Sequence, residues 1–175
     1  MKKMMMFAAI ALSVAVAQSA QVAWEMEGVK APGSSALITG GGTAYLFNAA
    51  TYTTAQVEKA IEEGTFGSLT HVGKVASVDE EEAGYISAGK LDDSSIANNT
   101  QYTFFAVVFD SADTSSGNYF VTQEKTITTK GSGLTTVAFG DQSSNSANWT
   151  AIPEPTSVAL LALGLAALGL KRKVG

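Results

Sequence analysis

Hydrophobic residues are spread unevenly along this 175-residue chain: both ends carry long apolar runs, and the middle alternates between short apolar stretches and polar turns. The first apolar run covers residues 4–17, and the second covers residues 156–170. Between them, short β-branched and aromatic stretches are separated by Gly, Ser, Asn and Asp, a pattern typical of β-structure. The chain is therefore predicted to hold a β-rich body between two apolar tails.

Several stretches of the body are predicted to be strands. The strongest is residues 101–110, which is so apolar that we expect it at the centre of a sheet, buried on both faces. Residues 119–129 follow a polar loop and should return beside it as the second arm of a hairpin. Weaker strand signals cover residues 43–47, 66–78, 84–91 and 134–139.

One helix is predicted, over residues 54–63. Thr53 can cap its N-terminus, Gln56 completes a capping box three residues later, and Gly64 follows its end. Its apolar positions share one face, and its charged positions share the other. The fold class predicted from these elements is mainly β: a small antiparallel β-sandwich with one short inserted helix, flanked by an N-terminal signal helix and a C-terminal transmembrane helix.

The stretch before the longest strand refines this prediction. Ile96, a turn, and then Thr100-Gln101-Tyr102 form a pattern that is similar to the E–F corner of fibronectin type III domains, over about residues 91–129. The resemblance implies that Tyr102 bonds upstream backbone through its hydroxyl and that Ile96 is a core residue. Asn98 stands where that family usually has proline, and that fold does not require the inserted helix.

The N-terminal tail has the features of a secretory signal peptide, which we place at residues 1–20. Lys2 and Lys3 precede the apolar run, and Ala15-Val16-Ala17 fits the small-x-small cleavage pattern. Ala17-Gln18-Ser19 is a second choice of cleavage site. A retained N-terminal anchor is the alternative to a cleaved signal.

The C-terminal tail has three parts in a fixed order: Pro153-Glu154-Pro155, the apolar run 156–170, and Lys171-Arg172-Lys173. A helix over the apolar run would reach about 22 Å, a marginal span for a hydrocarbon core of roughly 30 Å. The basic cluster should remain on the cytoplasmic side, and the prolines should keep the preceding segment extended. A plain membrane anchor fits these features as well as a sorting signal does.

This order of parts closely resembles the PEP-CTERM sorting signal, over about residues 152–173; the same cassette is also called an ice-binding protein C-terminal domain. The resemblance implies recognition of Pro153, Glu154 and Pro155 and processing by a membrane-embedded exosortase. It also implies an exported cell-envelope or surface protein of a Gram-negative bacterium, initially anchored in the inner membrane with a cytoplasmic C-terminus. It says nothing about the body.

The chain therefore divides into a signal peptide (1–20), an acidic β-rich domain (21–130), a flexible Ser/Asn-rich linker (131–151) and a sorting and anchor segment (152–175). The sequence contains no cysteine, which excludes disulfides and thiol catalysis. Outside the two tails six lysines stand against fifteen acidic residues, a net charge of −9. This charge argues against nucleic acid and anionic lipid headgroups as partners of the body.

Candidate chemistry in the body is sparse. His71 is the only histidine, and no nucleophile-elbow or zinc-protease motif accompanies it, so we predict no enzyme activity. The acidic groups at 79–82, 92–93 and Asp110/Asp113 lack the spacing of a calcium loop and are predicted to be solvated turns, so no metal or cofactor is expected. Aromatic residues that can stack on sugar rings are Tyr45, Tyr52, Tyr85, Tyr119 and Trp149, although most of them should lie in the core.

These observations predict an exported, non-catalytic envelope protein with a structural or interaction role in the extracellular matrix. Its expected partners are an exosortase-like processing enzyme, the membrane through residues 156–170, and surface polysaccharide. The alternative function is a surface glycan-binding module or a small secreted enzyme.

Overall fold

The computed structural model describes residues 19–79 and 81–154. Within them, nine strands form one sheet in the order β8-β1-β4-β3-β2-β5-β6-β9, with β7 paired to β5. The elements are β1 (Ser19–Glu27), β2 (Thr43–Asn48), α1 (Thr54–Glu62), the 3₁₀ helix η1 (Phe66–Ser68), β3 (Val72–Val78), β4 (Ile86–Ala97), β5 (Gln101–Phe109), β6 (Asn118–Val121), β7 (Lys125–Thr128), β8 (Leu134–Asp141) and β9 (Thr150–Ala151).

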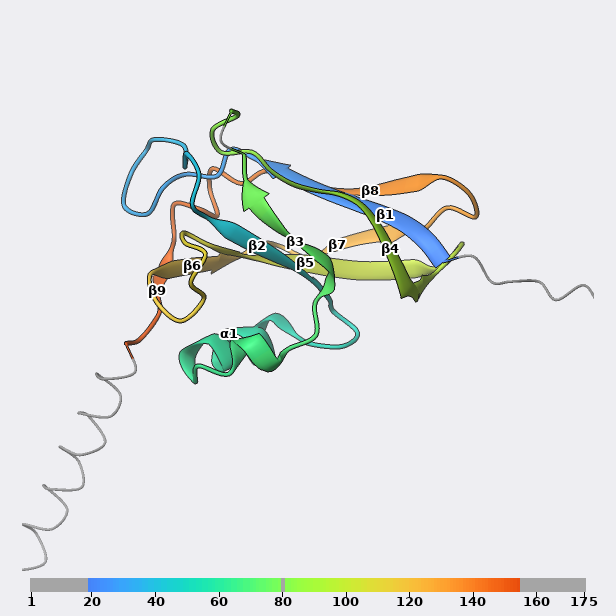
Figure 1. Ribbon diagram of the computed structural model, residues 1–175, viewed down its shortest axis with the longest axis horizontal. Coiled ribbons are helices and arrows are strands. Elements are labelled where there is room, and N and C mark those ends of the chain that lie inside the picture. Colours follow the sequence, from blue (N-terminus) through green and yellow to red (C-terminus); the bar gives the residue numbers. More distant parts are fainter. Residues whose placement is uncertain (1–18, 80, 155–175) are drawn as a thin grey trace, which may run out of the picture.

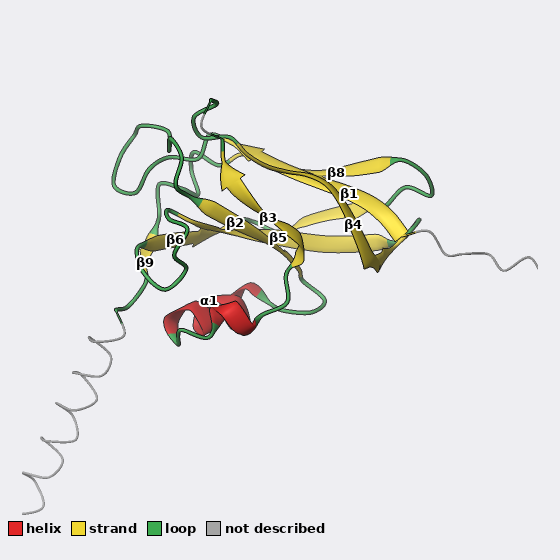
Figure 2. Cartoon of the chain, in the orientation of Figure 1, coloured by secondary structure: helices red, strands yellow, loops and turns green. Residues whose placement is uncertain are grey.

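The sheet folds over on itself at the junction between β3 and β4. These two strands pair only through Ser77↔Ser87 and Val78↔Ile86 and then diverge. One layer consequently contains β8, β1 and β4, and the other contains β3, β2 and β5 with β6 and β7 (Figure 1). The single helix lies beneath the second layer (Figure 2). The predicted mainly-β, sandwich-like fold with one helix is confirmed at this level.

Two details of the sandwich differ from the prediction. The two layers belong to one continuous sheet, and β1 pairs with β8 in parallel, so the arrangement is not wholly antiparallel. The parallel pair arises because the chain crosses from the β7 edge back to the first layer before β8 begins. Local hydrophobic pattern predicts a strand but does not name its neighbour.

The main hydrophobic core lies between the two layers. On β1 every second side chain enters it, including Trp24, which is 0% exposed. On β5 the even-numbered residues face the same core, and the strands β2, β3, β4 and β8 contribute the rest. Buried residues of this core include Val22, Met26, Leu46, Val78, Ile86, Ile96, Phe104, Val108, Phe120 and Val137.

A second core lies on the other face of β5, beneath α1. The odd-numbered residues Phe105, Val107 and Phe109 face this side, where Val57 and Ile61 of the helix cover them. All six residues from Phe104 to Phe109 are therefore buried. The prediction that this strand is buried on both faces is confirmed, and the inserted helix is what covers the second face.

The helix begins and ends as its sequence predicts. The amide of Gln56 donates to Thr53 Oγ1 at 3.3 Å, and the amide of Thr53 donates to Gln56 Oε1 at 2.9 Å, forming the expected capping box. Gly64 follows the helix with a φ of +69°, a backbone conformation that glycine adopts without strain.

The predicted return of residues 119–129 beside β5 is confirmed, with an interruption. β6 and β7 both pair antiparallel with β5, but the register changes by one residue between them. At the break, the Thr122 amide donates to the Ala106 carbonyl at 2.9 Å, and Thr122 Oγ1 accepts from the Ala106 amide at 2.9 Å. In a regular strand, an even-numbered and an odd-numbered residue face opposite sides of the sheet. The bulge shifts this alternation by one residue, so Phe120 and Ile127 both pack on the core between the two layers.

The turn between β4 and β5 contains the hydrogen bonds implied for a tyrosine corner. The Ala97 amide donates to the Tyr102 hydroxyl at 2.8 Å, and that hydroxyl donates to the Ser95 carbonyl at 3.4 Å. Ile96 is 1% exposed, as expected for a core residue before the turn. Asn99 takes the left-handed conformation, with a φ of +51°, that the tight turn requires.

Replacing Tyr102 with phenylalanine is expected to lower the free energy of unfolding by about 0.5–1.5 kcal/mol, because the Ala97 amide and the Ser95 carbonyl lose the hydroxyl that they bond. The ring can still stack on Phe104, whose centroid lies 5.8 Å away. Urea denaturation of the purified chain measures the change. Tyr52→Phe is the matched control, because the Tyr52 hydroxyl only accepts an exposed 3.5 Å bond from the Thr70 amide. Equal effects of the two changes would contradict a special role for the corner.

The segment 131–151, assigned to a flexible linker, is built into the fold. The strand predicted within it at residues 134–139 is confirmed as β8, but the linker prediction is wrong for the loop that follows, because hydrogen bonds hold this loop to the segment after β1. Ser146, fully buried, accepts at Oγ from the Lys30 amide at 2.8 Å, and Trp149 Nε1 donates to the Lys30 carbonyl at 2.9 Å. Ser and Asn are frequent here because their side chains form hydrogen bonds with backbone groups in turns, and such bonds also occur in ordered loops.

Three smaller predictions also need correction. Residues 66–71 do not extend the strand predicted over 66–78, because η1 occupies 66–68 and β3 begins at Val72. The pair Asp92 and Asp93, predicted to be a solvated turn, lies within β4, where Asp92 is opposite Gln21 of β1. At the N-terminal end, β1 begins at Ser19, two residues before the predicted start of the domain.

Candidate functional site

The C-terminal end of the body is fixed to the sheet immediately before the predicted sorting motif. Ala151 pairs with Asn118, and Thr150 pairs with Tyr119, which makes β9 the outermost strand beyond β6. The next residue, Ile152, is only 6% exposed and packs in the core beneath α1. Its amide donates to the Gly117 carbonyl at 2.9 Å. Among the residues described up to 154, Ile152 is therefore the last whose side chain is buried in the fold.

The loop that receives Ile152 is held by one carboxylate. Asp110 accepts from the Asn118 amide at 2.8 Å and from Asn118 Nδ2 at 2.7 Å. Gly117 has a φ of +87°, and a Cβ on it would collide with the Asp110 carboxylate. The carbonyl that anchors Ile152 is consequently positioned by a loop in which glycine and aspartate are both needed.

The surface around this exit is acidic. Burial raises the pKa of the Tyr119 hydroxyl, and the nearby carboxylates of Glu58 and Glu62 on α1 raise it further. In the same loop, hydrogen bonds from Ser115 and Ser116 hold the pKa of Asp113 below its usual range. The Asp113 carboxylate is thus ionised near neutral pH, whereas the Tyr119 hydroxyl keeps its proton. The tail leaves the domain beside an acidic rim that contains Asp113, Glu58 and Glu62.

Only the start of the predicted sorting motif lies within the described residues. Pro153 and Glu154 are exposed and follow directly on Ile152. Pro155, Lys171, Arg172 and Lys173 lie outside the described part of the chain, as do the proposed membrane segment 156–170 and the signal peptide up to residue 18. Among the residues that are described, no helix has the length and apolar character needed to cross a membrane.

His71 is placed among aromatic side chains. Its ring lies 5.2 Å from that of Tyr45 at an angle of 73°, and its Nδ1 is buried with no hydrogen-bond partner in the described structure. It lies just before β3, and no Ser–His–Asp hydrogen bonding is formed around it there. A lone ring in edge contact with tyrosine is the geometry of a packing residue.

Two of the acidic residues weighed as calcium ligands, Asp79 and Asp113, accept hydrogen bonds from the amides and hydroxyls of their own loops. Asp79 Oδ1 accepts from the amides of Glu81 and Glu82, at 2.7 and 3.1 Å. Asp113 accepts from the hydroxyls of Ser115 and Ser116 at 2.6 and 2.8 Å. Within residues 19–79 and 81–154, no three His, Asp or Glu side chains gather in a way that could hold a metal ion.

The aromatic candidates for sugar stacking do not form a shared face. Tyr119 is buried, and Tyr45 meets the rings of Phe66 and Phe109 edge-on at 5.0 and 5.8 Å. Trp149 packs edge-on against Phe120 at 4.8 Å. The Tyr85 hydroxyl donates to Glu25 at 2.8 Å, and Tyr52 packs against Phe47. The rings of Tyr45, Tyr52, Tyr119 and Trp149 therefore pack against the two cores, as expected for most of the five.

Sequence reasoning did not identify Ile152 or the loop around Gly117 as part of the site. A local signal existed, because Trp149 and Ile152 are large apolar residues in an otherwise polar stretch just before Pro-Glu-Pro. Such residues are normally buried against something.

Comparison with known proteins bears on the tail. Neither curated proteins nor solved structures give a significant match to the chain. Residues 151–173 match the PEP-CTERM protein-sorting motif, and this agrees with the predicted span of about 152–173. The motif marks a protein that exosortase sorts to the cell envelope, and it begins at the two residues, Ala151 and Ile152, with which the folded body ends. The chain is thus a surface protein that carries a PEP-CTERM sorting signal.

Proposed function

We propose that this chain is a non-catalytic protein of the Gram-negative envelope, with a structural or interaction role in the extracellular matrix. A cleaved signal peptide exports it, residues 156–170 hold it in the inner membrane with the basic cluster in the cytoplasm, and exosortase acts on the Pro153-Glu154-Pro155 region. Surface polysaccharide is the proposed partner of the body.

One observation carries the sorting part of this proposal. The fold ends at Ile152, and the next residues, Pro153 and Glu154, are exposed. A folded body therefore presents the recognition element without unfolding its main cores. The start of β1 at Ser19 favours signal cleavage after Ala17, because cleavage after Ser19 would remove a residue that pairs with Ala97.

The non-catalytic part rests on how the candidate catalytic residues are used. His71 packs against Tyr45, and Asp79 and Asp113 accept hydrogen bonds from their own loops. Hydrolysis of a glycoside, ester or peptide by the purified chain that is lost in His71→Ala would overturn this part and leave the sorting proposal intact.

Changing Pro153, Glu154 and Pro155 to alanine is expected to abolish processing while leaving membrane insertion intact, because the apolar run and the basic cluster are unchanged. The stability of the body should not change, since Pro153 and Glu154 are exposed. The measurement is the apparent mass of the protein in membrane and surface fractions, in a host that contains exosortase.

A second set of substitutions distinguishes recognition of the sorting motif from insertion into the membrane. Changing Lys171, Arg172 and Lys173 to serine should mislocalise or release the protein, because the cationic stop on the cytoplasmic side is lost. Normal maturation of the Pro-Glu-Pro variant would leave residues 156–170 as a plain anchor, and unchanged fractionation of the serine variant would exclude a role for the charge.

A further inference from the structure

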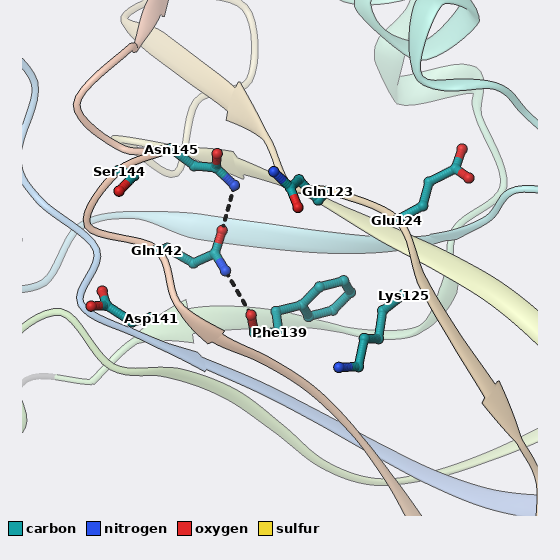
Figure 3. Close-up of a pocket in the computed structure, with 8 residues that line it drawn as sticks. All are labelled: Gln123, Glu124, Lys125, Phe139, Asp141, Gln142, Ser144 and Asn145. Atoms are coloured by element: carbon teal, nitrogen blue, oxygen red, sulfur yellow. Dashed lines mark hydrogen bonds between the residues drawn. The ribbon is translucent and has the colours of Figure 1, made fainter.

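A polar cleft opens where the β6–β7 bulge approaches the end of β8. Its volume is 430 Å³, within the roughly 300–1,000 Å³ of typical ligand pockets. β7 and β8 come together here without ladder pairing, so their edges leave a gap in the otherwise continuous wall. Figure 3 shows the side chains that line it: Gln123, Glu124, Lys125, Phe139, Asp141, Gln142, Ser144 and Asn145.

One wall of the cleft is a fixed row of amides. Gln142 is 5% exposed, and its Nε2 donates to the Phe139 carbonyl at 2.9 Å. Its Oε1 accepts from Asn145 Nδ2 at 2.9 Å, which fixes the Asn145 amide in turn (Figure 3). Asn145 Oδ1 makes no hydrogen bond within the described structure. Gln123, an exposed residue of the bulge, adds a third amide to the lining. The cleft thus offers both donors and acceptors in set positions.

The other wall is apolar. The ring of Phe139 is half-buried and extends toward Glu124 and Lys125 (Figure 3). Trp24 holds it from the core side, with ring centroids 6.3 Å apart and an interplanar angle of 88°. A ring supported in this way is a rigid platform, and binding to it costs little side-chain entropy.

The charges of the cleft limit its ligand. Glu124 and Asp141 are carboxylates, and Lys125 is the one cation that lines the cleft. Hydrogen bonds from Ser143 hold the pKa of Asp141 below its usual range, so that this carboxylate is ionised near neutral pH. An anionic ligand such as a uronic acid would be repelled, whereas hydroxyl groups can donate to the carboxylates and accept from the amides and the ammonium.

We propose that this cleft binds a neutral, hydroxyl-rich saccharide, with a pyranose ring against Phe139 and its hydroxyls bonded to Gln123, Glu124, Lys125 and Asn145. Sugars combine an apolar C–H face with rows of hydroxyls that both donate and accept, and this combination matches the two walls. The inference names the ligand class for the matrix role proposed above and rests on that role.

The test uses the purified full chain in detergent on an array of neutral, amino and uronic-acid oligosaccharides. The wild-type chain should retain neutral oligosaccharides and not the uronic acids. Phe139→Leu keeps an apolar contact with Trp24 but removes the flat ring, and Gln123→Ala removes an exposed amide; each should weaken binding roughly tenfold. Asn148→Ala, an exposed amide outside the cleft, is the matched control and should bind as wild type.

Failure to retain any neutral saccharide by a folded chain would overturn the proposal, and so would binding that survives both cleft substitutions. Circular dichroism of each variant excludes loss of fold as the cause. Cell fractionation tests the sorting proposal independently of the saccharide array, because the cleft variants should fractionate as the wild-type chain does. A mis-sorted variant that still binds saccharide would count against the proposed function and not against the cleft.

Discussion

Replacing Phe105 with alanine is expected to lower the free energy of unfolding by about 3–5 kcal/mol. The side chain is 0% exposed and stacks on Phe47, with ring centroids 5.6 Å apart and an interplanar angle of 19°. It lies in the core between β5 and α1, where the helix cannot move into the space of the missing ring without unpacking its own Val57 and Ile61 from their other neighbours. Chemical denaturation of the purified chain measures the loss, which is a large share of the roughly 5–15 kcal/mol typical of a domain.

The neighbouring residue on β5 provides a comparison for the Phe105 variant. Phe104 faces the opposite core, so Phe104→Ala should cost a similar amount, which can hold only if the strand is buried on both faces. Gln101, exposed on the same strand, should tolerate alanine within about 0.5 kcal/mol. A Phe105 variant as stable as the Gln101 variant would show that α1 does not seal a second core.

Replacing Ile152 with aspartate is expected to detach β9 and to cost about 2–4 kcal/mol, because a carboxylate cannot occupy the apolar site beneath α1 without a partner. The segment can swing into solvent, since it lies at the end of the body. Hydrogen exchange should accelerate at the Ile152 amide, which donates to Gly117, and along β6, while β1 and β5 remain protected.

Ala151→Asp is the control for this change. It introduces the same charge one residue earlier in β9, where the side chain is exposed and no apolar contact is lost. Its stability and its exchange should match the wild-type chain. If both aspartate variants behave alike, the added charge near the acidic rim is responsible, and Ile152 does not anchor the tail.

Local signals were sufficient for several parts of this fold. The capping box at Thr53 and Gln56 placed α1 to within one residue, because capping depends only on neighbours in sequence. The apolar run that became β5 predicted burial on both faces because no polar position interrupts residues 104–109. The hydrogen bond of Tyr102 to upstream backbone was implied by the resemblance to the fibronectin type III corner, and its partners lie five and seven residues upstream.

The parts that could not be predicted depend on distant pairing. The alternation of Ala20, Val22, Trp24 and Met26 is a strand signal for β1, but it carries no information that β8 would lie beside it in parallel. Residues 142–152 have the composition of a linker, and they are ordered only because Lys30 and Gly117 supply hydrogen-bond partners. The cleft joins the bulge at 122–124 to the end of β8, so no stretch of sequence contains it.

The two ends of the body leave it at opposite poles. Ser19 lies beside Ala97, near the start of β5, whereas Tyr119, which pairs with β9, lies opposite Phe109 at its end, roughly 26 Å along the strand at ~3.3 Å per residue (Figure 1). In the proposed inserted state, residues 153–155 give a tether of about 10 Å, so the Ile152 pole stands close to the lipid. The turns at residues 98–100 and 129–133 then lie at the far pole and are the part of the body most distant from the inner membrane.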